Sequence, residues 1–196
     1  MKIATTLRPA ACAVALLCAA LTAQSATLVV VSRDAAGVGF NDPTPVAPVG
    51  GNTGTTLGAQ RLQVYQFVAG LWGAALQSDV TITVNAGWEA LMCSSTDAVL
   101  GSAAANNIWH DFPGSKPGTW YPQALANKIA GVNLSAGQPD DGFGNADIKT
   151  QFNVNFGKTG CFDGGSFYLG LDGKATGNQV NFMTTLLHEI GHGLGF

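Results

Sequence analysis

Two histidines and one glutamate lie close together near the end of the sequence, in the segment HEIGH at residues 188–192. Residues four apart in a helix project from neighbouring turns on one face, so His188 and His192 can meet a single ion. A catalytic zinc site has three protein ligands, nitrogen among them, and leaves a fourth position to water. Glu189 follows the first histidine, where its carboxylate can reach that water as the general base. These residues predict Zn2+ as a cofactor, with His188 and His192 as ligands and Glu189 as the catalytic residue.

A histidine pair beside a glutamate can also arise by chance on a solvated helix face. Glutamate occurs only at Glu89 and Glu189, so the cluster does not belong to an ordinary charged helix. Residues 182–187 are apolar nearly all round, which indicates a buried helix whose polar atoms need partners. Glycines crowd the helix end, where they permit close packing and a sharp turn: Gly191, Gly193 and Gly195. These features favour metal binding over chance.

The helix that must carry this cluster is predicted from about residue 179 to residue 192, with Asn178 as its candidate N-cap. A longer helix is predicted over residues 56–76, where apolar side chains recur at helical spacing for about five turns. Thr55 or Thr56 is the candidate cap of that helix. The two helices would supply most of the helical surface of the fold.

Strands are predicted where side chains alternate or are rich in β-branched and aromatic types: residues 27–31, 79–85, 147–156 and 166–171. The first is expected to be buried and the second half-buried. Weaker patterns indicate a strand within residues 93–105, a loop over residues 109–121 and a short helix over residues 123–129. This order of elements predicts one α+β domain.

Residues 1–25 predict a secretory signal peptide, because two basic residues precede an apolar run over residues 10–20. That run is shorter than the roughly 18 to 20 residues that a membrane-spanning helix needs. Cleavage before Ala26 leaves a soluble domain over residues 26–196. We expect this domain to be secreted, to the extracellular space or the periplasm, without membrane association after cleavage.

Charge and cysteine content restrict the partners and the compartment of the secreted domain. Removing Lys2 and Arg8 lowers the nine Lys and Arg to seven, against twelve Asp and Glu, which gives a formal charge of −5. This charge argues against a nucleic-acid partner. Only Cys93 and Cys161 remain after cleavage, and an isolated pair in an oxidising compartment is usually a disulfide. A disulfide that closes the loop between the two cysteines would stabilise the fold by about 4 kcal/mol.

The histidine motif resembles the signature HExxHxxGxxH of the metzincins, a group of zincin metallopeptidases. His188, Glu189, His192 and Gly195 match this signature position by position. In that family the glycine turns the chain so that a third histidine completes the site. The equivalent position would be 198, and the sequence ends at Phe196. The resemblance implies a zincin-like domain that is incomplete at its C-terminus, and it leaves the third ligand unassigned.

The same resemblance implies a twisted mixed sheet, two long helices, and an edge strand above the cleft with which the substrate backbone pairs. Residues 147–156 or 166–171 are the candidates for that edge strand. The signal peptide and the loop NDPTPVAPVGGN at residues 41–52 also resemble those of secreted bacterial metallopeptidase-like proteins. In such proteins we expect the chain to continue, into a protease-associated domain in some cases.

Other residues with metal-binding chemistry have simpler interpretations. His110 is the only remaining histidine, and its aromatic neighbours favour a structural role over that of third ligand. Asp163 and Asp172 lie in glycine-rich turns that they can stabilise. The segment PDDGFGNAD at residues 139–147 could bind calcium through its oxygens. It lacks the spacing of an EF-hand loop, so ordinary turn formation is preferred.

The leading functional hypothesis is a secreted zinc-dependent metalloendopeptidase, or its N-terminal part, which hydrolyses peptide bonds of protein or peptide substrates through metal-activated water. The alternative is a non-catalytic secreted zincin-like module with a vestigial metal site. Glu189 argues against that alternative, because a purely structural zinc site would use four protein ligands. A metallohydrolase acting on other amides or on esters would use the same water activation and is a third hypothesis.

Overall fold

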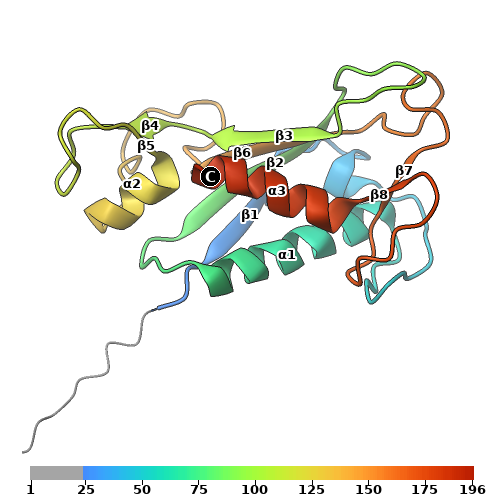
Figure 1. The fold of residues 1–196 in the computed structure, drawn as a ribbon, viewed down its shortest axis with the longest axis horizontal. Helices are drawn as coiled ribbons and strands as arrows, with labels where there is room; N and C mark the ends of the chain where they lie inside the picture. The colour runs from blue at the N-terminus through green and yellow to red at the C-terminus, as the bar shows by residue number, and fades with distance from the viewer. Residues whose placement is uncertain (1–23) are drawn as a thin grey trace, which may run out of the picture.

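A four-stranded mixed sheet is the frame of the fold in the computed structural model, which describes residues 24–196 (Figure 1). Its strand order is β1-β2-β6-β3; β1, β2 and β6 run parallel, and β3 runs antiparallel to β6. The bounds are Leu28–Ser32 for β1, Ile82–Glu89 for β2, Gly101–Ala105 for β3 and Ile148–Asn153 for β6. The predicted signal peptide, residues 1–25, lies almost wholly outside the described residues. Within residues 24–196, no helix is both long and apolar enough to cross a membrane.

Two long helices, α1 (Leu57–Ala75) and α3 (Phe182–Leu194), cover one face of this sheet (Figure 1). The short helix α2 (Gln123–Ala130) lies beside the C-terminal end of α3. Four short strands form two further pairs, and one short 3-10 helix precedes α1: β4 (Ile108–Trp109) with β5 (Tyr121–Pro122), β7 (Ser166–Tyr168) with β8 (Gln179–Asn181), and η1 (Gly39–Asn41). The predicted α+β class is therefore confirmed.

The hydrophobic core fills the space between the sheet and the two long helices. Tyr65 of α1 is fully buried there, and its ring stands edge-on to Phe152 of β6 with 6.1 Å between centroids. Its hydroxyl oxygen lies 2.9 Å from Oγ1 of Thr150, so the one polar atom of the ring is satisfied. The same cluster buries residues at helical spacing on both helices: Val64, Val68, Phe182, Leu186 and Ile190.

The predicted helices are confirmed in kind, and the start of α3 is corrected. α1 covers all but the ends of residues 56–76, and Thr56 caps it by accepting a hydrogen bond from the Ala59 N–H at 3.1 Å. α3 begins at Phe182 instead of residue 179, because residues 179–181 form β8 beside β7. Asn181, not Asn178, is its cap, since Asn181 Oδ1 accepts from the Thr184 N–H at 3.1 Å.

Each segment predicted as a strand overlaps one in the structure, including β3 within residues 93–105, but the setting of two strands differs from the prediction. β1 was expected to be buried, yet it is an edge strand, and Val29 and Val31 are 43% and 45% exposed. β2 was expected to be half-buried over residues 79–85. It begins three residues later, lies between β1 and β6, and is buried at every position from Val84 to Trp88, on both faces. Residues 109–121, predicted as a loop, carry β4 and β5 at their two ends.

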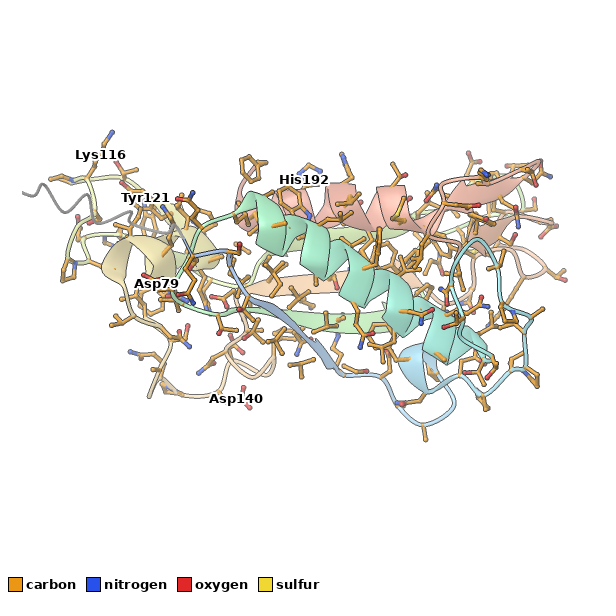
Figure 2. All side chains as sticks on the ribbon, turned by 90° about the horizontal axis from the view of Figure 1, so that it is seen from below. Asp79, Lys116, Tyr121, Asp140 and His192 are labelled. Atoms are coloured by element: carbon orange, nitrogen blue, oxygen red, sulfur yellow. A yellow bond between two sulfur atoms is a disulfide. The ribbon has the colours of Figure 1, made fainter. Side chains whose placement is uncertain are left out.

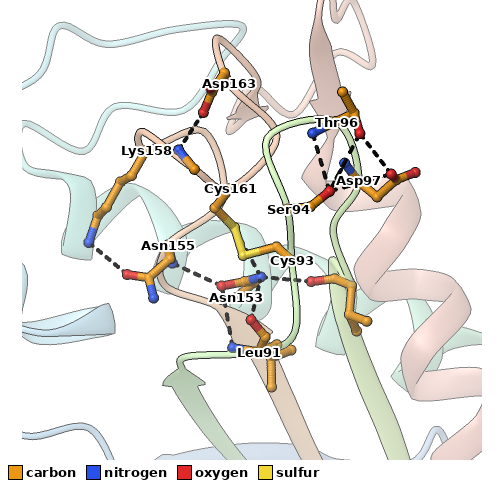
Figure 3. Close-up of a disulfide and its surroundings, with 12 residues drawn as sticks. Leu91, Cys93, Ser94, Thr96, Asp97, Asn153, Asn155, Lys158, Cys161 and Asp163 are labelled. Carbon is orange, nitrogen blue, oxygen red and sulfur yellow. Dashed lines mark hydrogen bonds between the residues drawn. A yellow bond between two sulfur atoms is a disulfide. The ribbon is translucent and has the colours of Figure 1, made fainter.

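Cys93 and Cys161 form the predicted disulfide, which joins the loop after β2 to the loop after β6 (Figure 3). Backbone hydrogen bonds connect the same two loops: the Phe162 N–H donates to Ser94 O at 2.6 Å and the Asp163 N–H to Ser95 O at 2.8 Å. The side-chain amide of Asn153 donates to Val99 O at 3.0 Å from beneath the disulfide. The two loops are therefore tied at several points at the end of the sheet where α3 begins.

α3 approaches β6 so closely that one of its glycines is needed for packing. A Cβ at Gly193 would overlap Cγ2 of Ile148, whereas a Cβ at Gly191 would lie 3.6 Å from Cζ2 of Trp72, an ordinary contact. We expect Gly193→Ala to lower the free energy of unfolding by about 1 to 2 kcal/mol, because overpacking outweighs the gain in helix propensity. Gly191→Ala, the matched control, should leave stability unchanged or raise it by about 0.5 to 1 kcal/mol. Urea denaturation measures both, and equal effects would contradict the packing argument.

Candidate metal centre

The two histidines of α3 converge as their spacing predicts. Their Nε2 atoms lie 3.0 Å apart, and the rings are nearly perpendicular, at 84°. Two nitrogens that bind one tetrahedral zinc at about 2.0 to 2.1 Å are separated by about 3.3 Å. A small rotation of either imidazole would bring His188 and His192 to that separation.

The amphipathic pattern of α3 explains why the histidines face outward. Leu186 and Ile190 are fully buried against the sheet. His188 and His192 each follow one of them by two residues, which is about 200° around a helix. Both imidazoles are exposed accordingly. Figure 2 shows His192 projecting from α3 beside the C-terminal end of α1.

Glu189 occupies the border between the histidine face and the core. It is only partly exposed, and none of the ion pairs formed within residues 24–196 involves it. Burial raises the pKa of the Tyr65 hydroxyl far above its usual value; the hydrogen bond with Thr150 opposes this shift, and the negative charge of Glu189 is a smaller contribution to it. The Glu189 carboxylate therefore lies near the edge of the core, and among residues 24–196 it has no basic partner that would hold it away from a substrate.

The end of α3 forms the sharp turn that the resemblance implied at Gly195. This residue has a φ of +98°, in the left-handed region that glycine adopts without strain. Its N–H donates to the carbonyls of Gly191 and His192, both at 3.1 Å, and the Phe196 N–H donates to Gly191 O at 3.0 Å. The turn places Phe196 O 3.3 Å from Nδ1 of His192.

The edge strand beside the candidate centre is β3, and neither predicted candidate takes this place. Residues 147–156 contain β6, which is an inner strand, and residues 166–171 contribute β7 to a separate pair. β3 has the sequence GSAAA and packs along α3. Its other side has no strand partner within residues 24–196. A close approach explains the glycine, because a Cβ at Gly101 would lie 2.5 Å from Cδ1 of Phe152.

No third protein ligand joins the histidine pair within residues 24–196, where no group of three or more His, Cys, Asp or Glu could hold a metal ion. His110 lies elsewhere: its Nδ1 is 2.6 Å from Oδ2 of Asp111 and its ring packs on Trp120. Asp172 accepts hydrogen bonds from the Tyr168 hydroxyl at 2.6 Å and from the Lys174 N–H at 3.1 Å. These partners fit the structural roles that the sequence suggested for both residues.

The acidic loop at residues 139–147 directs its carboxylates at N–H groups of the protein. Asp140 accepts from the backbone N–H groups of Gly142 and Gly144, at 3.0 and 3.1 Å. Asp147 turns away to the Thr83 N–H at 2.7 Å and to the Asn127 amide at 2.6 Å. Burial, the largest influence, raises the pKa of Asp147 although these hydrogen bonds oppose it. The geometry supports the turn interpretation of this loop.

Comparison with known proteins assigns no family: no protein-family model matches the chain, and no match is found among curated proteins or among solved structures. The functional argument therefore depends on the geometry of α3 and its neighbours.

Proposed function

We propose that this chain carries the active-site helix of a secreted zinc-dependent metalloendopeptidase with a zincin-like fold. The observation that carries the proposal is the convergence of the His188 and His192 Nε2 atoms, 3.0 Å apart on the exposed face of α3, with Glu189 beside them. Two neutral imidazoles suit zinc, and the exposed face leaves room for further ligands. Two long helices on one face of a mixed sheet give the general α+β class, which the proposal requires and which many other folds share.

The chemistry assigned to each residue follows from its position. His188 and His192 would hold Zn2+, which acts as a Lewis acid toward a carbonyl oxygen and lowers the pKa of water. Glu189 takes a proton from the attacking water and delivers it to the leaving amine of the cleaved peptide bond.

An extended peptide is the substrate that the neighbouring strand can bind. β3 presents unpaired backbone N–H and C=O groups along the side of the sheet next to α3, and such an edge can pair with an extended chain. Its small side chains, glycine, serine and alanine, place no bulky group beside that chain. Secretion is supported by the disulfide between Cys93 and Cys161, since disulfides persist in oxidising compartments.

The second candidate function is a non-catalytic secreted module that uses the same scaffold for binding or structure. The observation that favours it is that only two metal ligands come together within residues 24–196. A site with two histidines binds zinc more weakly than a site with three or four protein ligands. The two functions differ in whether peptides are cleaved.

Zinc binding tests the shared premise of both candidates. We expect the chain to bind one Zn2+, and His192→Ala to weaken binding by about 100-fold, because a chelating pair becomes a single ligand. His110→Ala is the matched control and should bind zinc like the unmodified chain. Competition with a chromophoric chelator measures the three affinities. Equal zinc affinity of His192→Ala and the unmodified chain would show that zinc does not bind at the histidine pair of α3.

A further inference from the structure

One ring nitrogen of His192 faces the backbone of the turn that follows α3. Phe196 O lies 3.3 Å from Nδ1 of His192. A carbonyl oxygen only accepts hydrogen bonds, so a hydrogen bond at this contact assigns the hydrogen to Nδ1. In a neutral imidazole, Nε2 then carries the lone pair, which accepts a hydrogen bond from His188 Nε2–H at 3.0 Å in the metal-free chain.

This arrangement depends on the turn after α3 staying folded. The turn begins at Gly191, whose carbonyl accepts from the N–H groups of Gly195 and Phe196 at 3.1 and 3.0 Å. Gly195 itself fits closely, since a Cβ there would lie 2.6 Å from Cγ of Pro122. The turn is short, and helix ends fray unless tertiary contacts hold them.

Trp72, in the last turn of α1, supplies such a contact. Its ring stacks on the Phe196 ring with 5.8 Å between centroids and 15° between planes. The same indole lies under α3 near Gly191. Its Nε1 is buried without a hydrogen-bond partner among residues 24–196. The contacts of the Trp72 ring with the turn are therefore packing contacts.

We propose that Trp72 is a positioning residue for His192: by packing against Phe196 and α3, it holds the carbonyl that keeps the hydrogen of His192 on Nδ1 and the Nε2 lone pair toward the metal. This inference rests on the proposed function for its consequence, tighter zinc binding. The tautomer of His192 is a property of the metal-free chain, so this part of the inference is independent of the proposed function. Carbonyl partners of ligating histidines fix tautomer and ring orientation in this way.

The test compares Trp72→Ala with Trp72→Phe, which keeps an aromatic ring for stacking, and with the matched control Phe67→Ala. Phe67 lies on α1 about 140° around the helix from Trp72 and is partly exposed. Nitrogen-15 NMR of metal-free protein at a pH of about 8, where an ordinary imidazole is neutral, reports the tautomer of His192. Chelator competition reports zinc affinity.

Trp72→Ala is expected to move His192 toward the Nε2–H tautomer and to weaken zinc binding by about 10-fold. Trp72→Phe and Phe67→Ala should keep the Nδ1–H tautomer and bind zinc within about threefold of the unmodified chain. A folded Trp72→Ala protein with unchanged tautomer and affinity would overturn the assignment. Should that variant fail to fold by circular dichroism, Trp72→Leu, which fills space without stacking, is judged by the same two outcomes. Absence of zinc binding by the unmodified chain would contradict the proposed function. The comparison of His192 tautomers would still decide the role of Trp72.

Discussion

Glu189→Gln is expected to abolish peptide hydrolysis while leaving zinc binding almost unchanged. Glutamine has the same shape as glutamate but cannot accept a proton from water at neutral pH. Losing a general base slows a reaction by roughly 10² to 10⁴. Zinc binding should persist, because the converging nitrogens belong to His188 and His192. Mass spectrometry of an unfolded protein substrate measures cleavage, and atomic absorption measures bound zinc.

The sequence provides a matched control for this substitution, because Glu89 is the only other glutamate. Glu89 lies at the end of β2, where its Oε1 is 2.9 Å from Nε of Arg33. Glu89→Gln should therefore cleave peptides at the rate of the unmodified chain. Equal cleavage by Glu189→Gln and the unmodified chain would exclude the base mechanism. Zinc bound without any cleavage by the unmodified chain would favour the non-catalytic module.

The histidine pair and the long helices could be predicted because their signals are local. His188 and His192 meet wherever residues 188–192 are helical, whatever surrounds them. The cap of α1 at Thr56 is equally local, since the bond spans three residues. The start of α3 was missed for a long-range reason. Its first predicted residues pair with β7 in a strand, and a periodic pattern in one segment contains no information about that partner.

Pattern indicates a strand within residues 93–105 only weakly, and neither the edge position of β3 nor the role of Trp72 can be predicted from it, because tertiary packing defines both. Gly101–Ala105 lacks the β-branched and aromatic side chains that signal a strand, and close approach to Phe152 and α3 explains why small residues occur there. Trp72 has the spacing of an ordinary core residue on α1. Its contact with Phe196 joins residues that are 124 positions apart, which no single-segment pattern reveals.

Removing the disulfide is expected to lower the free energy of unfolding by about 4 kcal/mol. Cys93 and Cys161 are 68 residues apart. In the chain-entropy model, closing a loop of this length lowers the conformational entropy of the unfolded chain, which stabilises the fold by about 4 kcal/mol. The double substitution Cys93→Ser with Cys161→Ser should lower Tm by roughly 10 °C for a domain of this size. The folded state should change little, because the Ser94 and Ser95 carbonyls still bind the loop after β6. Thermal unfolding followed by circular dichroism measures the loss.

Two comparisons separate this entropic effect from damage to the native fold. Reducing the unmodified chain should lower Tm as much as the double substitution does, since both remove the same cross-link. Zinc affinity should stay unchanged in both, because the disulfide is far from His192 along α3. The disulfide lies near the first residues of α3, and His192 lies in its last turn (Figure 1). A loss below about 1 kcal/mol would mean that the unfolded chain stays compact enough for the cross-link to add little. A parallel loss of zinc affinity would instead mean that the two loops position α3.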